Sequence, residues 1–173
     1  CVARNREALA TTLGVAVDHI VVPHQIHETH CRAIGTRYLE SDGQSRRQLL
    51  EGVDAGRTSQ RGVCVGVSTA DCIPLLFLDT RRKAVAAVHA GWRGTRKRIV
   101  ETVVRAMRDT FGTEPASLRC VIGPGISMES FEVGQEVYDA FAQGGFDMGG
   151  IAKRMPRMHA DDPQPEKWHI DLK

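Results

Sequence analysis

The stretch that decides the fold is VCVGVSTADCIPLLFLDTRRKAVAAVHAGWRGT, which spans residues 63–95. Two apolar runs, at residues 63–67 and 73–78, predict buried strands, and a third run covers residues 84–88. At the ends of these runs the chain places the thiol of Cys72 and the imidazole of His89. Because a buried sheet holds the loops at its ends rigidly, we expect a functional site at this corner.

The composition indicates a globular domain and excludes several classes of function. The chain has 173 residues, of which 42% are hydrophobic and 25% are charged, so it is long enough for one domain with its own core. A net charge of +2 does not predict nucleic-acid binding, and no apolar run approaches the roughly 20 residues that span a bilayer. Five irregularly spaced cysteines do not form a disulfide framework, which favours a reducing, cytoplasmic location. Cys64 and Cys120 are expected to be buried thiols inside strands.

The remaining elements follow from periodicity and from turn residues. The sequence predicts helices at residues 5–13, 95–111 and 134–141, and strands at residues 19–22, 118–122, 131–133 and 168–172. The strand at residues 118–122 is expected to be buried, and the Gly-Pro-Gly turn after it to let a backbone approach a ligand closely. The polar segment 35–62 is predicted to be a long connection with one helical turn near residues 46–50. Residues 143–165 have no consistent period and are predicted to form a mobile loop or lid.

A histidine-rich segment precedes the central stretch. Residues 24–31 hold three of the seven histidines and Cys31. In an extended chain, alternation places Gln25 and His27 on one face. The spacing alone leaves open whether His27 is a metal ligand or a structural histidine.

Cys72 and His89 support two kinds of chemistry. As a nucleophile, Cys72 would be held as a thiolate by His89. As metal ligands, the two residues need a third donor, for which His27 is the candidate. One cysteine and two histidines with an open position match a catalytic zinc site, and these donors suit zinc or copper better than magnesium or calcium. Spacing does not separate a zinc site from a Cys–His pair or from a structural role.

The turn after His89 is basic. Arg93, Arg96, Lys97 and Arg98 crowd the start of the predicted helix 95–111, where cations oppose the helix dipole. A bound anion would reverse that effect. We expect the last three of these side chains to be solvated and Arg93, flanked by Trp and Gly, to point into the site.

The motifs resemble a known family. The runs STADCIPLL (68–76) and HAGWRGT (89–95) are similar to those of the polyphenol oxidase/YfiH-type proteins, also called laccase-domain proteins. Further matches in the same order are QIH (25–27), DA (54–55), IGPGI (122–126), FEVG (131–134) and IDL (170–172). The resemblance implies an α+β fold, a single layered α/β/β/α domain with mixed sheets, like that of a cysteine-dependent deamidase toxin.

The resemblance also implies an activity and a cofactor. It assigns a zinc site to His27, Cys72 and His89. It implies phosphorolysis of purine nucleosides (adenosine, inosine, methylthioadenosine) and hydrolytic deamination of adenosine, with phosphate and the nucleoside as small-molecule partners. Two alternatives have been described for such proteins: a copper-dependent phenol oxidase, and a metal-free cysteine hydrolase using Cys72 and His89. A binding protein without turnover is a further rival.

Individual roles follow from these expectations. In deamination, zinc would lower the pKa of a bound water for attack on C6 of adenine. In phosphorolysis, Arg93 and nearby backbone N–H groups would hold phosphate, and Gln25 is a further candidate substrate ligand. Asp71 is a candidate acid/base residue, a support for the metal ligands or a plain structural carboxylate. A multicopper redox centre needs more histidines than His27 and His89 supply.

The chain departs from the family pattern in two ways. Glu28 follows His27 where the family usually has Gly, and this change would alter the backbone or add a carboxylate near the metal. Family members also begin with additional strands and continue past the IDL motif. We therefore expect residues 1–173 to form a single catalytic domain that lacks N- and C-terminal segments.

Overall fold

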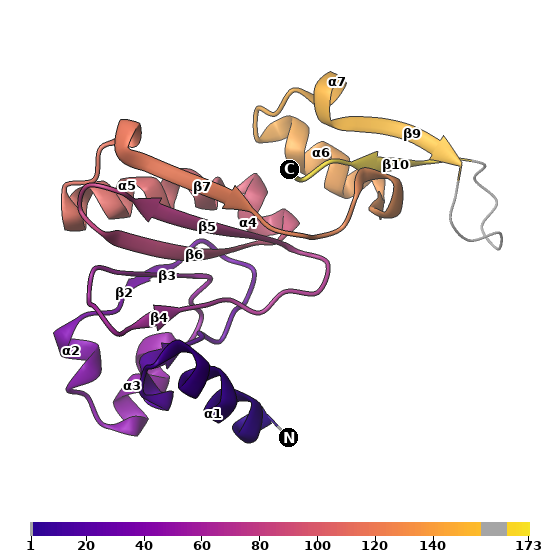
Figure 1. Cartoon of the computed structure of the whole chain (residues 1–173). Helices are drawn as coiled ribbons and strands as arrows, with labels where there is room; N and C mark the ends of the chain where they lie inside the picture. Colours follow the sequence, from indigo (N-terminus) through magenta and orange to yellow (C-terminus); the bar gives the residue numbers. More distant parts are fainter. Residues whose placement is uncertain (1, 157–165) are drawn as a thin grey trace.

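The computed structural model describes residues 2–156 and 166–173, which fold around a five-stranded mixed sheet (Figure 1). Its strands, in spatial order, are β2 (Cys31–Ala33), β3 (Ala55–Thr58), β6 (Ala84–Ala90), β5 (Ile73–Asp79) and β7 (Leu118–Ile122). β2 and β3 are parallel, whereas the other three neighbouring pairs are antiparallel. The predicted mixed sheet and α+β class are therefore confirmed.

The hairpin of β5 and β6 forms the centre of the sheet and is set by the sequence pattern. Ile73, Leu75 and Phe77 alternate along β5 and are buried on one face of the sheet. The helix α5 (Ile99–Phe111) covers this face with three side chains at four-residue spacing, Ile99, Val103 and Met107, none of which is exposed to solvent. Burial of each such side chain stabilises the fold by roughly 1.5–3 kcal/mol.

The predicted helix 95–111 is wrong at its beginning, because the chain forms two helices there. α4 (Trp92–Arg96) follows β6 directly, and α5 starts only at Ile99. Arg98 separates them in the left-handed conformation, with φ of 57°. The apolar stripe begins at Ile99, so the chain turns at Arg98 to place that stripe against the sheet.

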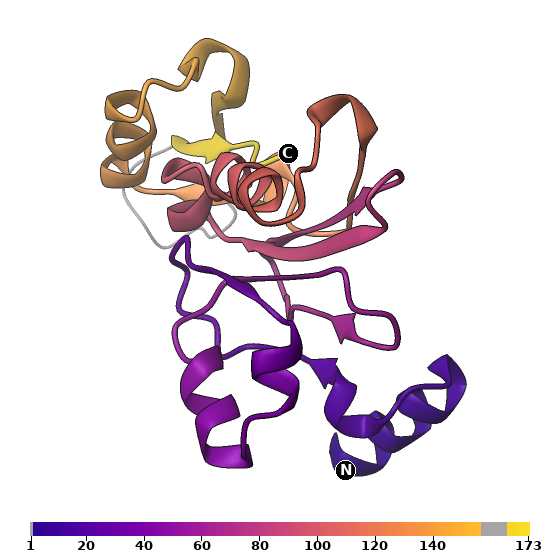
Figure 2. The ribbon, with the colours of Figure 1, turned by 90° about the vertical axis from the view of Figure 1, so that its left-hand side faces the viewer.

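The N-terminal part covers the other side of the sheet. α1 (Val2–Leu13), α2 (Thr36–Leu39) and α3 (Gly43–Leu50) lie on the side opposite to α5, which gives the predicted layering of helices outside and strands inside (Figure 2). β1 (Ile20–Val21) pairs in parallel with β4 (Cys64–Val65), a two-residue strand where a longer one was predicted at residues 63–67.

The prediction of a long connection at residues 35–62 is wrong, although the helical turn predicted near residues 46–50 lies within α3. The segment contains α2, α3 and β3. Asp42 caps α3 by accepting hydrogen bonds from the backbone of Gln44 and Ser45, at 2.8 and 2.9 Å. Tyr38 is buried in a small core, where Leu49 and Leu50 pack from α3. Because these helices bury only one narrow face, their overall composition is polar.

The C-terminal part forms a separate three-stranded antiparallel sheet. Its order is β8 (Glu132–Val133), β10 (Glu166–Ile170) and β9 (Ala152–Pro156), with α6 (Gln135–Gln143) and α7 (Met148–Ile151) beside it. Phe141 and Ile170 lie in its core. The predicted lid at residues 143–165 is thus partly wrong, since residues 148–156 are regular, and its residues 157–165 lie outside the described residues. Short 3-10 turns occur at Val17–His19, Pro115–Ser117 and Met128–Ser130.

The strand β7 is exposed rather than buried, contrary to the prediction. It is the edge strand of the large sheet, and Cys120 is exposed, with Val121 at 62% and Ile122 at 52% of their full accessibility. Leu76 and Leu78 of the neighbouring β5 are also exposed. An apolar sequence run therefore indicated a strand correctly but not its burial.

Among the helices of residues 2–156 and 166–173, none is both long and apolar enough to cross a membrane.

Candidate metal centre

Three donor side chains from distant parts of the sequence meet at one end of the sheet. His27 lies between β1 and β2, Cys72 immediately precedes β5, and His89 is in β6. Their ligand atoms all lie within 4.8 Å of one another. The two imidazole rings are 4.7 Å apart between centroids, at an angle of 72°. The structure therefore brings together the three residues that the sequence singled out as ligands.

Strand pairing explains how two of the three come together. Pro74 is paired with His89 in the antiparallel hairpin, so Cys72, two residues earlier, lies beyond the end of β6 on the same side of the sheet. His89 is buried, Cys72 is half-buried and His27 is exposed. The cluster is thus closed towards the core and open at His27.

Asp54 organises the centre, a role that the sequence analysis did not assign. Its carboxylate is fully buried and accepts a hydrogen bond from Nδ1 of His89 at 2.8 Å. It also accepts the backbone N–H groups of Ile26, His27 and Glu28, at 3.3, 2.9 and 2.8 Å. Because Nδ1 of His89 donates its N–H to this carboxylate, Nε2 keeps a lone pair that can coordinate a metal ion. This arrangement is typical of metal-binding histidines. The signal in the sequence that could have pointed to this role is the position of Asp54 directly before the buried strand β3.

The same carboxylate holds the backbone of His27 in an unusual conformation. His27 has φ of 65°, in the left-handed region that residues other than glycine seldom adopt. His27 is consequently not extended as the predicted alternation assumed, although Gln25 and His27 do line the same cavity. The glycine expected after His27 from the family pattern is replaced here by Glu28, while the left-handed turn occurs at His27 itself.

A glycine makes room for the donors. A Cβ atom at Gly91 would lie 2.8 Å from Cδ2 of His27, closer than real Cβ atoms approach, and 3.0 Å from Sγ of Cys72, a distance at which the neighbour must give way. Gly91 therefore lets the chain after β6 pass directly beneath two of the three donors.

The Gly-Pro-Gly turn supports the loop that carries Cys72, and its residues do not line the cavity beside the three donors. Ile126 donates its N–H to the carbonyl of Asp71 at 2.8 Å. A Cβ atom at Gly125 would lie 3.1 Å from the carbonyl oxygens of both Asp71 and Cys72. The close backbone approach that the two glycines permit is thus to the loop that carries Cys72.

A cavity of about 540 Å³ opens beside the donors. His27, Cys72 and His89 line it together with Gln25 and Asp71. Asp71 is exposed in this cavity. Both ends of the Gln25 amide are engaged by Ser68, donating to its carbonyl at 2.8 Å and accepting from its N–H at 2.7 Å, so this side chain orients the loop before Cys72.

The basic turn after His89 is largely tied to the protein. The guanidinium of Arg93 lies over the Trp92 ring, 4.3 Å from its centroid, and Arg93 does not line the cavity. Arg96 donates to the carbonyl of Ala140 at 3.0 Å.

The other two cations of the turn are also paired, so the expectation that they are merely solvated is wrong. Lys97 contacts both oxygens of Glu28 at 2.6 Å. Arg98 pairs with Glu101 at 3.1 Å. Glu28 is therefore paired with Lys97, and the donor cluster does not include its carboxylate.

The electrostatics of the centre favour a bound cation. Burial raises the pKa of the Cys72 thiol, and the nearby carboxylates of Asp71 and Asp54 raise it further. Burial would also raise the pKa of Asp54, but the hydrogen bonds from His89 and from three backbone N–H groups outweigh it and hold that pKa below its ordinary value. The centre thus contains a permanent negative charge beneath two imidazoles and a thiol.

These residues fit a zinc ion. One sulfur and two imidazole donors with one open side match the ligand set of a catalytic site, and a cation beside Asp54 favours the thiolate form of Cys72. Within the described residues, no other group of three or more His, Cys, Asp or Glu side chains is arranged to hold a metal ion. The four cysteines of the described chain are free thiols.

Comparisons with known proteins identify relatives over the whole chain. The model of the family described as "Multi-copper polyphenol oxidoreductase laccase" matches residues 1–173. A purine nucleoside phosphorylase of Bacteroides thetaiotaomicron is 43% identical over 99% of this chain and 61% of its own length. An adenosine deaminase from an unknown prokaryotic organism is 39% identical over 97% of this chain and 61% of its own length. The chain therefore spans about three fifths of the length of these curated relatives.

Solved structures share the fold. The Bacillus licheniformis hypothetical protein YfiH superposes with a TM-score of 0.81 at 24% identity, over 98% of this chain and 61% of that one. A Neisseria meningitidis protein superposes with a TM-score of 0.75 at 30% identity, over 99% of this chain and 61% of that one.

Proposed function

Because the chain belongs to the family described as multi-copper polyphenol oxidoreductase laccase, we propose that it is a zinc-dependent enzyme acting on purine nucleosides. The proposed reactions are phosphorolysis to the free base and ribose 1-phosphate, and hydrolytic deamination of adenosine. The names of two relatives, a purine nucleoside phosphorylase and an adenosine deaminase, support this choice of substrate. The proposed location is the cytoplasm.

The observation that carries the proposal is the cluster of His27, Cys72 and His89 at the floor of a cavity of about 540 Å³. The cavity is within the range that small-molecule sites usually occupy. The single three-donor cluster of the described residues favours one zinc ion over a multicopper centre, which requires many more histidines.

The zinc ion, when bound by these three residues, supplies a Lewis acid that activates water at neutral pH. Asp54 keeps His89 in the tautomer that presents Nε2 and fixes the His27 loop through backbone hydrogen bonds. We assign proton transfer to and from the purine to Asp71, whose carboxylate is exposed in the cavity. Gln25 positions the Ser68 loop that forms one wall.

Phosphorolysis requires a second, anionic substrate. We assign its binding to Arg93, whose guanidinium lies over Trp92 in the first turn of α4, directly after β6. The planar guanidinium matches the geometry of a phosphate.

The test combines metal analysis with product analysis. The purified chain is loaded with zinc, dialysed and assayed for bound metal. It is then incubated with inosine or adenosine, with and without phosphate. We expect one zinc per chain, hypoxanthine from inosine only when phosphate is present, and inosine from adenosine in either buffer.

Two variants sharpen this test. His27→Ala removes a donor and should abolish stable zinc binding and turnover. His24→Ala is the matched control: it removes a histidine three residues away whose Nδ1 contacts Glu51 at 2.7 Å and which is outside the cluster, so its zinc content should be unchanged. Absence of product with one zinc bound would refute the proposal. So would turnover by zinc-free protein accompanied by covalent modification of Cys72, which would identify a cysteine hydrolase.

A further inference from the structure

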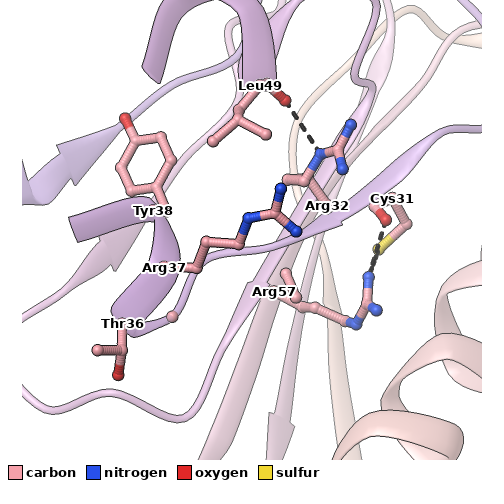
Figure 3. A pocket seen from close by; sticks show the side chains of 9 residues that line it. Cys31, Arg32, Thr36, Arg37, Tyr38, Leu49 and Arg57 are labelled. Atoms are coloured by element: carbon pink, nitrogen blue, oxygen red, sulfur yellow. Dashed lines mark hydrogen bonds between the residues drawn. The ribbon is translucent and has the colours of Figure 1, made fainter. Parts of the chain in front are cut away.

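A second cavity, of about 460 Å³, shares no lining residue with the metal centre. It lies among β2, β3, α2 and α3, and three arginines line it: Arg32, Arg37 and Arg57 (Figure 3). No acidic residue of the described chain lines it. Three guanidinium groups around one cavity repel one another unless an anion lies between them.

The hydrogen bonds of the three arginines leave much of their donor capacity unused. Arg32 donates Nε to the carbonyl of Leu49 at 3.0 Å, and within the described residues its two terminal nitrogens make no hydrogen bond. Within the described part of the chain, no hydrogen bond or ion pair holds the Arg37 guanidinium, which extends from α2 towards Arg32 in Figure 3.

Arg57 is the fixed member of the group. It donates to the carbonyl of Cys31 at 2.8 Å and to Oγ1 of Thr110 at 2.9 Å, so its guanidinium is held between the edge strand β2 and the helix α5. No carboxylate that lines the cavity neutralises the positive charge of Arg57. The site thus combines one positioned cation with two whose terminal N–H groups are free.

We propose that this cavity binds a small molecule with a diphosphate group, such as a nucleoside diphosphate. The terminal nitrogens of Arg32 and Arg37 can each grip a phosphoryl group through two N–H donors, and the positioned Arg57 adds a third positive charge. A cavity of this size exceeds what one phosphate fills and matches the volume range of small organic ligands. Leu49 supplies an apolar wall for the non-phosphate part.

The thiol of Cys31 offers an internal reporter of occupancy. It is half-buried at the edge of the cavity, with its sulfur 3.2 Å from a terminal nitrogen of Arg57. Burial raises the pKa of this thiol, an effect that Arg57 only partly offsets. A ligand on Arg57 would cover Cys31 and slow its alkylation, whereas the exposed thiol of Cys120 on β7 would be unaffected.

Binding is measured by isothermal titration of the zinc-free chain, because diphosphates chelate zinc. The probes are orthophosphate, pyrophosphate and adenosine diphosphate. We expect pyrophosphate to bind at least about tenfold more tightly than orthophosphate, because it engages two arginines rather than one, and binding to weaken steeply with added salt. Tighter binding of adenosine diphosphate than of pyrophosphate would assign the apolar wall to the nucleoside part, and equal affinities would restrict the ligand to the diphosphate itself.

Two variants separate this cavity from general surface charge. Arg32→Gln with Arg37→Gln should weaken pyrophosphate binding by at least about tenfold. Arg47→Gln, on α3 but outside the cavity, is the matched control and should retain the affinity. Should the double variant lose its fold, Arg37→Gln alone serves, since within the described residues no hydrogen bond or ion pair holds that guanidinium.

Three results would overturn the proposal. One is equal affinity in the parent and in the Arg37→Gln variant, and another is an equal loss in Arg47→Gln. The third is an unchanged ratio of Cys31 to Cys120 alkylation under saturating pyrophosphate, measured by peptide mass spectrometry, which would place the ligand elsewhere. None of these outcomes bears on the proposed nucleoside chemistry, which requires no residue of this cavity.

Discussion

Replacing Asp54 with asparagine tests whether one buried carboxylate holds the metal centre together. Each of its oxygens accepts two hydrogen bonds: one takes His27 N–H and His89 Nδ1–H, and the other takes the N–H groups of Ile26 and Glu28. Asparagine has the same shape but only one acceptor oxygen. Whichever way the amide is turned, its NH₂ group therefore faces two donors.

The structure sets the size of the effect. Two hydrogen bonds to a charged acceptor are lost, at about 1.5–3 kcal/mol each, so the free energy of unfolding should fall by about 3–6 kcal/mol. For a chain of this length, that corresponds to a decrease in Tm of about 6–24 °C. Because the carboxylate also orients His89, the zinc affinity should fall by about 10- to 100-fold.

Thermal unfolding followed by circular dichroism, and competition for zinc against a chelator, measure the two effects. The matched control is Asp71→Asn, which makes the same chemical change at an exposed carboxylate of the same corner. Its Tm should change by no more than the equivalent of about 0.5 kcal/mol. If Asp54→Asn unfolds at the same temperature as Asp71→Asn, Asp54 does not have the organising role assigned to it.

Three further substitutions test other parts of the structure. Gly91→Ala places a Cβ atom 2.8 Å from the His27 ring and should lower zinc affinity at least about tenfold in chelator competition, whereas Gly43→Ala, with nothing within 4 Å, should not. Asp79 has a pKa lowered to about 2, because hydrogen bonds to its carboxylate outweigh the opposing effect of burial. Its contribution to stability is therefore complete above about pH 4 and is lost as the pH falls towards 2. When the stability of Asp79→Asn is measured as the pH is lowered, the loss of stability due to Asp79 should be missing. A stability profile identical to that of the parent would contradict this. Met107→Ala empties a fully buried site under the sheet and should cost about 2–5 kcal/mol in urea unfolding; a cost below 1 kcal/mol would contradict the packing of α5.

The sequence predicted the centre of the fold well because strong local patterns and local contacts agree there. Continuous apolar runs predict β5 and β6, and a stripe at four-residue spacing predicts most of α5. The helix packs on the hairpin that these two strands form. The three donors were singled out by residue type and by motif, and the structure brings them within 4.8 Å of one another. That they bind a metal remains a prediction.

Other features depend on contacts between distant residues and could not be read from local patterns. The central role of Asp54 depends on a hydrogen bond to His89, 35 residues further along the chain. The exposure of β7 depends on its edge position, since an apolar run has the same appearance in a central strand and in an edge strand. The helix α2 was missed, and α3 was predicted only as one turn at residues 46–50, because both helices bury few side chains. The left-handed conformation of Arg98 follows from the direction in which α5 packs on the sheet, which no local pattern indicates.

The exposed edge of the large sheet has a consequence for handling the protein. β7 presents unpaired backbone N–H and C=O groups beside the apolar side chains of Val121 and Ile122, with Arg119 as the nearby charge. Such an edge is a template for pairing with a strand of another molecule, and a single cation gives little electrostatic protection against it. Concentrated samples of this chain should therefore aggregate by edge-to-edge association, and a lysine in place of Val121 should raise the concentration at which they remain clear.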